Sequence, residues 1–117
     1  MSPLTVNLIQ GTTRWHDPGG NRDDFESLLA AGASADVILL PEMFSTGFTM
    51  AAKAMAETMD GPTVTWLRER AAALGSVVAG SLIVDDGGYF NRLIWATPDG
   101  QIQHYDKRHL FRMAGED

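Results

Sequence analysis

Residues 35–40 of this 117-residue chain read Ala-Asp-Val-Ile-Leu-Leu, and Pro41 and Glu42 follow at once. Apart from Asp36, the run has no polar alternation, which is typical of a strand that is buried on both faces in a sheet covered by helices. Pro41 ends the strand because proline has no N–H to donate to the sheet. The run therefore predicts a buried strand of an α/β sheet, with Glu42 just past its carboxyl end.

The segments around this run predict the rest of a mixed sheet. We expect two amphipathic helices, one capped by Asn21 and ended by Gly32, the other beginning at Pro62 and ended by Gly75. Residues 41–50 are expected to form a loop. Further strands are predicted at residues 4–10, 76–84, 89–97 and 102–105, with turns at 85–88 and 98–100. The order β-α-β-α-β-β-β indicates an α/β fold in one domain.

Composition excludes several classes of function. The net charge is −6 and the nine Lys and Arg residues form no cluster, so neither nucleic acid nor a polybasic membrane contact is expected. There is no cysteine to make a disulfide or a thiolate metal site, and the three histidines lie far apart or are flanked by residues that are not metal ligands. We therefore expect no metal site. No apolar run approaches the ~20 residues of a membrane span, which favours a cytoplasmic protein.

Glu42 is the first candidate for chemistry. Ligands of open α/β sheets bind at the carboxyl ends of the strands, where this residue is predicted to lie. Partial desolvation beside Met43, Phe44 and Phe48 would suit its carboxylate to general-base work. The structural alternative is a solvated loop residue. Position alone leaves both interpretations open.

Lys107 is the second candidate, because it directly follows the last predicted strand. A lysine held there can stabilise a developing oxyanion as a fixed positive charge. The alternative is an exposed basic turn that balances Asp106. His109 is interpreted as a structural histidine, and neither Ser45 nor Ser81 stands in a nucleophile-elbow sequence.

The two segments together resemble the nitrilase superfamily of carbon–nitrogen hydrolases. Residues 39–44 (Leu-Leu-Pro-Glu-Met-Phe) with the following Ser-Thr-Gly-Phe resemble its catalytic-glutamate segment, and residues 105–111 (Tyr-Asp-Lys-Arg-His-Leu-Phe) its catalytic-lysine segment. Gln10, residues 15–18, Asn21 and Asn91 also fit the pattern. The resemblance runs from residue 4 to the end, and residues 44–50 and 107–116 are most similar to the ω-amidase branch.

The resemblance implies a function and a division of labour. ω-Amidases hydrolyse the distal amide of small α-keto acids such as 2-oxoglutaramate, without a metal or organic cofactor. Glu42 would be the general base, Lys107 would stabilise the oxyanion, and a cysteine would form a thioester as ammonia leaves. Glu116 would match a supporting glutamate. Phe44 and Phe48 would line the substrate pocket, although both fit a core position equally well. Family members commonly form homodimers.

One departure from the family is severe, because the 117 residues contain no cysteine. The family fold is a four-layer αββα sandwich with helices outside and is more than twice as long. We therefore expect residues 1–117 to be the N-terminal portion of one incomplete domain, with an uncovered sheet face and open edges. The alternative function is a non-catalytic fragment that serves as a binding or oligomerisation module. A coincidental match in an unrelated α/β domain is the third interpretation.

Overall fold

The computed structural model describes residues 3–32 and 34–107 of the chain. In chain order, its elements are β1 (Val6–Leu8), α1 (Pro18–Ala31), β2 (Val37–Leu39), α2 (Ala52–Met55), α3 (Pro62–Leu74), β3 (Val77–Asp85), β4 (Tyr89–Ala96) and β5 (Ile102–Asp106). The predicted order is confirmed, with the addition of α2. This four-residue helix carries no side-chain cap, so the start signal on which the sequence prediction depended is missing.

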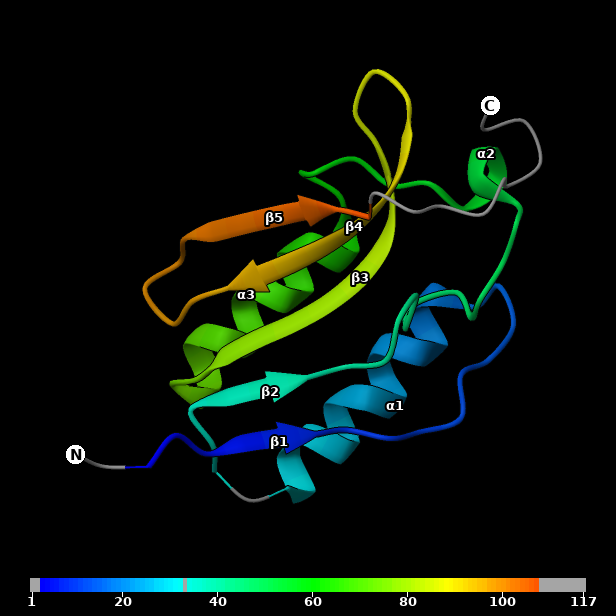
Figure 1. Cartoon of the computed structure of the whole chain (residues 1–117). Coiled ribbons are helices and arrows are strands. Elements are labelled where there is room, and N and C mark those ends of the chain that lie inside the picture. Colours follow the sequence, from blue (N-terminus) through cyan, green and yellow to red (C-terminus); the bar gives the residue numbers. More distant parts are fainter. Residues whose placement is uncertain (1–2, 33, 108–117) are drawn as a thin grey trace.

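The five strands form one sheet in the order β1-β2-β3-β4-β5 (Figure 1). β1, β2 and β3 are parallel, because a helical segment returns the chain between them. β4 pairs antiparallel with β3, and β5 pairs antiparallel with β4, each across a short turn. The sheet is therefore of mixed direction, as the sequence predicted.

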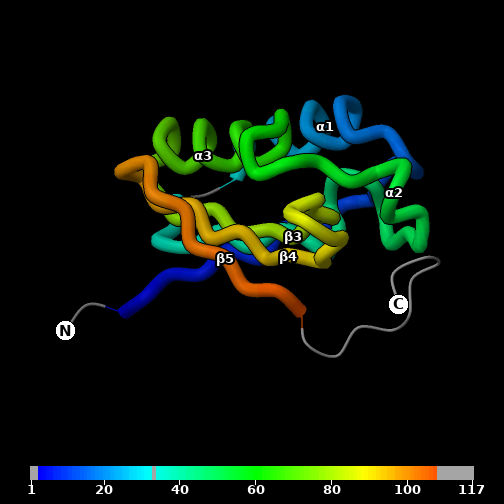
Figure 2. The backbone as a smooth tube through the Cα atoms, turned by 90° about the horizontal axis from the view of Figure 1, so that it is seen from above, coloured from blue at the N-terminus to red at the C-terminus, as the bar shows by residue number. Residues whose placement is uncertain are grey.

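Helices α1 and α3 cover one face of this sheet (Figure 2). The core lies between them and the sheet, and its fully buried side chains include Phe25 from α1, Leu67 from α3 and Leu82 from β3. Each such side chain stabilises the fold by about 1.5–3 kcal/mol on burial. The prediction of helices packed outside a mixed sheet is confirmed.

The opposite face of the sheet is left open by the residues that the structure describes. Side chains alternate along a strand, so the neighbours of core residues point to this side. Val6 and Leu8 of β1 are 46% and 65% exposed, and Leu93 of β4 is 38% exposed. Helix and sheet thus make two of the four predicted layers, and the expected uncovered apolar face is present.

Helix α1 begins earlier than predicted. The N-cap is Asp17, whose Oδ1 accepts a hydrogen bond from the Gly20 N–H at 3.1 Å, and Pro18 occupies the first turn. Asn21 is fully buried instead. Its amide donates to the carbonyl oxygens of Arg14 and Ser45, both at 2.8 Å, and accepts from the Arg14 N–H. Asn21 therefore joins the helix to the loop after β2, a tertiary role that its position before an apolar stripe did not reveal.

Candidate active site

Three polar side chains from distant parts of the sequence meet at one edge of the sheet. Glu42 follows β2, Asn91 lies near the start of β4, and Lys107 directly follows β5. Because β4 runs opposite to β3 and β5, its beginning lies beside the ends of its neighbours. This edge, at the carboxyl ends of the parallel strands, is where open α/β sheets bind ligands.

Glu42 is the point at which these side chains meet. Its Oε2 accepts a hydrogen bond from Lys107 Nζ at 3.0 Å and another from Asn91 Nδ2 at 2.7 Å. The main-chain N–H of Lys107 also donates to the carbonyl oxygen of Asn91 at 3.0 Å. The structure therefore brings together the two residues that the motifs singled out, a carboxylate base and a fixed positive charge.

The chain after Glu42 is anchored tightly. Met43 has a φ of 52°, which is uncommon for a residue other than glycine, and its side chain is fully buried beside Ala52 and Ile83. Its N–H donates to Ser81 Oγ on β3 at 2.9 Å. Packing and this hydrogen bond together stabilise the left-handed backbone of Met43. Because Met43 directly follows Glu42, its fixed backbone also limits the position of Glu42.

A cavity of about 430 Å³ opens beside these residues. Its wall combines polar and apolar side chains, and the lining residues are Leu39, Leu40, Glu42, Ala79, Ser81, Asn91, Leu93, Tyr105 and Lys107. Small-molecule sites have volumes of about 300–1,000 Å³ and this mixture of an apolar wall and a few polar groups. The cavity fits a small, partly polar molecule.

Glu42 is more open to solvent than the sequence led us to expect. The side chains of Glu42 and Lys107 are 43% and 34% exposed. The expected partial desolvation beside Met43 and Phe44 is not supplied by the described residues, because both side chains pack into the core instead. An exposed ion pair of this kind contributes little to stability, so its position beside a cavity, rather than its strength, points to chemistry.

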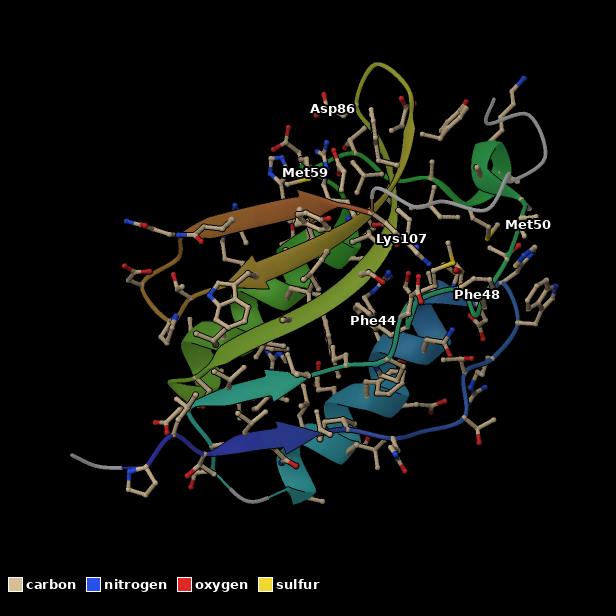
Figure 3. All side chains as sticks on the ribbon, in the orientation of Figure 1. Phe44, Phe48, Met50, Met59, Asp86 and Lys107 are labelled. Atoms are coloured by element: carbon tan, nitrogen blue, oxygen red, sulfur yellow. The ribbon has the colours of Figure 1, made fainter. Side chains whose placement is uncertain are left out.

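The remaining predicted site residues are distributed differently. Phe44 is fully buried and packs between Phe25 and Trp66, at ring-centroid distances of 5.8 and 5.7 Å. Of its two interpretations, the structure favours the core. Phe48 is 46% exposed, and its ring centroid lies 5.8 Å from Lys107 Nζ. Figure 3 shows Phe48 and Lys107 on the same side of the molecule.

Glu116 and His109 lie outside the described residues. The supporting role that the resemblance implies for Glu116 therefore stays a prediction.

Asp106 precedes Lys107 and fixes the end of β5. Arg92, whose side chain is only 5% exposed, donates from Nε and Nη2 to the two carboxylate oxygens at 2.6 and 3.0 Å. These charge-assisted hydrogen bonds hold the pKa of Asp106 below its ordinary value. Arg92 and Asp106 are paired residues of β4 and β5. Their ion pair therefore stabilises the pairing of the two strands just before Lys107.

Asn91 and Ser81 have no predicted catalytic or supporting role, although both contact the Glu42 segment. Asparagine is depleted in strands, so its presence inside the predicted strand at residues 89–97 is the signal that the sequence carries. In the structure Asn91 is only 3% exposed. Their contacts to residues 42 and 43 span 49 and 38 positions. A pattern within one strand cannot predict contacts of that separation.

The geometry agrees with what comparison of the sequence finds. The model of the Carbon-nitrogen hydrolase family matches residues 5–117. The chain belongs to the carbon–nitrogen hydrolase family. The resemblance to the nitrilase superfamily is therefore confirmed, and the coincidental match to an unrelated α/β domain is wrong.

Individual carbon–nitrogen hydrolases are also similar to the chain. It is 43% identical to Omega-amidase YafV of Yersinia enterocolitica, over 99% of this chain and 45% of that protein. It is 31% identical to 2-oxoglutaramate amidase of Bacillus subtilis, over 96% of this chain and 45% of that protein. The chain thus spans less than half the length of these curated relatives.

A solved structure shows the same fold. It is a CN-hydrolase superfamily protein from Xanthomonas campestris with an arsenic adduct in its active site. The TM-score is 0.92 at 52% sequence identity, and the match covers 99% of this chain and 44% of that one. The fold predicted for the family is confirmed for this portion.

The described part of the chain holds neither a group of side chains for a metal ion nor a helix that could span a membrane. No three His, Asp or Glu side chains among residues 3–32 and 34–107 gather closely enough to hold a metal ion. None of the helices in that part is long and apolar enough to cross a membrane.

Proposed function

We propose that the protein carrying this chain is an ω-amidase-type hydrolase that cleaves the distal amide of a small α-keto acid such as 2-oxoglutaramate. One observation carries the proposal: Lys107 Nζ lies 3.0 Å from Glu42 Oε2 at the edge of a cavity of about 430 Å³. Both residues come from the segments that resemble the catalytic ones of the family. The names of the Yersinia and Bacillus relatives support the substrate class.

In the proposed first half-reaction, Glu42 acts as a base. Its carboxylate takes the proton of a cysteine thiol, because the thiolate and not the thiol is the nucleophile. The thiolate attacks the amide carbon, a C–S bond forms, and Lys107 stabilises the oxyanion. The C–N bond then breaks, and the proton on Glu42 passes to the nitrogen, which leaves as ammonia.

In the second half-reaction, Glu42 acts on water. The carboxylate takes a proton from a water molecule, and the resulting hydroxide attacks the carbonyl carbon of the thioester. The C–S bond breaks, the ω-carboxylic acid is released, and Glu42 returns the proton to the thiolate. The 117 residues hold no cysteine, so the proposed nucleophile belongs to sequence outside them.

The proposal includes the organisation of the protein. Residues 1–117 would form part of one carbon–nitrogen hydrolase domain, and the protein would work in the cytoplasm as a homodimer. The support for these points is the family resemblance. Light scattering of the protein as its gene encodes it would test the dimer, and a monomeric mass at micromolar concentration would contradict it.

Ammonia release from 2-oxoglutaramate tests the function. The protein as its gene encodes it should release ammonia and 2-oxoglutarate in equal amounts. The 117-residue chain alone should release neither, because it supplies the base and the cation without a thiol. If neither protein hydrolyses any small ω-amide, the non-catalytic module becomes the better interpretation, and the exposed apolar face of the sheet is the observation that favours it.

A further inference from the structure

The two oxygens of the Glu42 carboxylate have different environments. Oε2 accepts hydrogen bonds from both Lys107 Nζ and Asn91 Nδ2. Within residues 3–32 and 34–107, Oε1 accepts none. A carboxylate on a flexible side chain rotates readily about its terminal bond, since that torsion is broad and roughly two-fold. Two donors converge on one oxygen, one from β4 and one from the residue that follows β5, and together they remove this freedom.

Asn91 is placed in a way that suits it to this task. Asn91 lies on β4 and is 3% exposed. Burial of a side-chain amide is unfavourable unless the amide is hydrogen-bonded. The only acceptor for its N–H group in the described part of the chain is Glu42 Oε2. The contact of Asn91 with Lys107 uses the main-chain carbonyl oxygen, so a substitution changes the first contact and leaves the second in place.

We propose that Asn91 is a positioning residue that fixes Oε2 of Glu42 against Lys107 and thereby presents Oε1 as the oxygen that accepts the proton. This inference rests on the proposed function. Asn91 acts through Glu42 and takes no part in bond making or breaking. Without Asn91, Oε2 would be held only by Lys107 Nζ, which lies at the end of a long, flexible side chain. The Asn91 side chain is short and approaches from the rigid sheet.

The proposal predicts a specific kinetic effect. Without the Asn91 amide, the carboxylate spends less time in the productive orientation, so kcat falls. KM changes little, because the hydrogen bond that is lost joins two protein groups. One hydrogen bond to a charged group corresponds to a change of roughly tenfold to a hundredfold in kcat.

The test uses the protein as its gene encodes it, with 2-oxoglutaramate as substrate. Asn91→Asp keeps the shape and replaces the donor with an acceptor, and Asn91→Ala removes the donor without adding charge. Gln101→Glu is the matched control, since it makes the same amide-to-acid change in the turn at the opposite end of β4 and β5 (Figure 1). Glu42→Gln is measured in parallel, and thermal unfolding is recorded for every variant.

Each outcome decides a separate point. Turnover by the wild type that Glu42→Gln abolishes supports the proposed function. A fall in kcat of tenfold or more in both Asn91 variants, with KM within about threefold and unfolding unchanged, then supports the positioning role. Wild-type kcat in either Asn91 variant overturns it and leaves the proposed function standing. Loss of folding in both also overturns it, because Asn91 is then structural, and an inactive wild type overturns both proposals.

Discussion

Lys107 is held through its main chain as well as its side chain. Its N–H donates to the carbonyl oxygen of Asn91, and its Nζ reaches Glu42 Oε2 at 3.0 Å beside the ring of Phe48. A lysine on a free loop would lose much of its charge effect to motion and solvent. Fixed donors and charges are effective in catalysis because they need no rearrangement when the oxyanion develops.

At this scale we predict that Lys107→Met lowers kcat by about 10²–10³-fold, the cost of removing one stabilising group from an oxyanion site. Ammonia release from 2-oxoglutaramate by the protein as its gene encodes it is the measurement. Lys53→Met is the matched control, because Lys53 is exposed on α2 and is not among the residues that line the cavity. Equal turnover of the two variants would contradict the assigned role of Lys107.

The sequence indicated the residues that carry the chemistry better than those that position them. Glu42 and Lys107 each lie just past the carboxyl end of a predicted strand, and the order of strands places both at one edge. Ser81 and Asn91 lie within strands. The contact of Ser81 with Met43 depends on the register of β2 against β3, and the contact of Asn91 with Glu42 depends also on the register of β3 against β4. No pattern within a single segment encodes these registers. Phe44 and Phe48 illustrate the same limit, since one is in the core and the other is exposed.

Among the elements, β3 must approach the loop after β2 very closely at Gly80. A Cβ added at Gly80 would lie 2.7 Å from the Phe44 ring. Phe44 cannot move aside, because it is fully buried between Phe25 and Trp66. The absence of a side chain at Gly80 therefore lets the loop that carries Glu42 lie against the sheet.

We predict that Gly80→Ala lowers the free energy of unfolding by about 1–3 kcal/mol, the usual cost of overpacking a core. Denaturant unfolding of the protein as its gene encodes it measures this. In Gly88→Ala, the control, the new methyl group would meet Phe90 at an ordinary 3.7 Å. A Gly80→Ala variant as stable as this control would contradict the account of the packing.

The Arg92–Asp106 pair at the end of β5 predicts a dependence of stability on pH. Arg92 lowers the pKa of Asp106 in the folded protein from an ordinary value of 3.8. A lowered pKa contributes stability that is fully present above the unfolded value and is lost as the pH falls through the folded value. The loss should therefore begin near pH 4 and grow below it.

Denaturant midpoints of the wild type and Asp106→Asn, measured between pH 7 and pH 2, test this prediction. The variant should be less stable at neutral pH, and the difference should shrink as the pH falls below 4. The pKa of Asp24 and the pKa of Asp99 are also lowered, but both groups are present in the two proteins and cancel in the difference. A constant difference across this range would refute the linkage to Asp106.

The elements themselves followed from short-range signals in most places. The start of α3 at Pro62 and its end at Gly75, which has a φ of 65°, agree with the sequence prediction. The predicted start of α1 is wrong by several residues, because Asp17 takes the capping position predicted for Asn21. Asn21 is buried by contacts with Ser45, 24 positions away, which a local signal cannot anticipate.

At the scale of the whole molecule, the described residues form a sheet with helices on only one face. The other face carries both the cavity and exposed apolar side chains such as Leu8 and Leu93. A predicted αββα sandwich accounts for this arrangement, since its second sheet would lie on this face. Sequence patterns indicate the buried strands. Which face of the sheet the helices cover depends on which of the alternating side chains of each strand point toward them.

The most direct test of the central claim is the turnover of 2-oxoglutaramate by Glu42→Gln, made in the protein as its gene encodes it. This variant keeps the size of the side chain and removes the base. Glu69→Gln, on the exposed side of α3, is the matched control, and circular dichroism confirms that both variants fold. We predict that kcat falls by about 10²–10⁴-fold in Glu42→Gln and stays at the wild-type value in Glu69→Gln. Wild-type turnover by a folded Glu42→Gln variant would contradict the account.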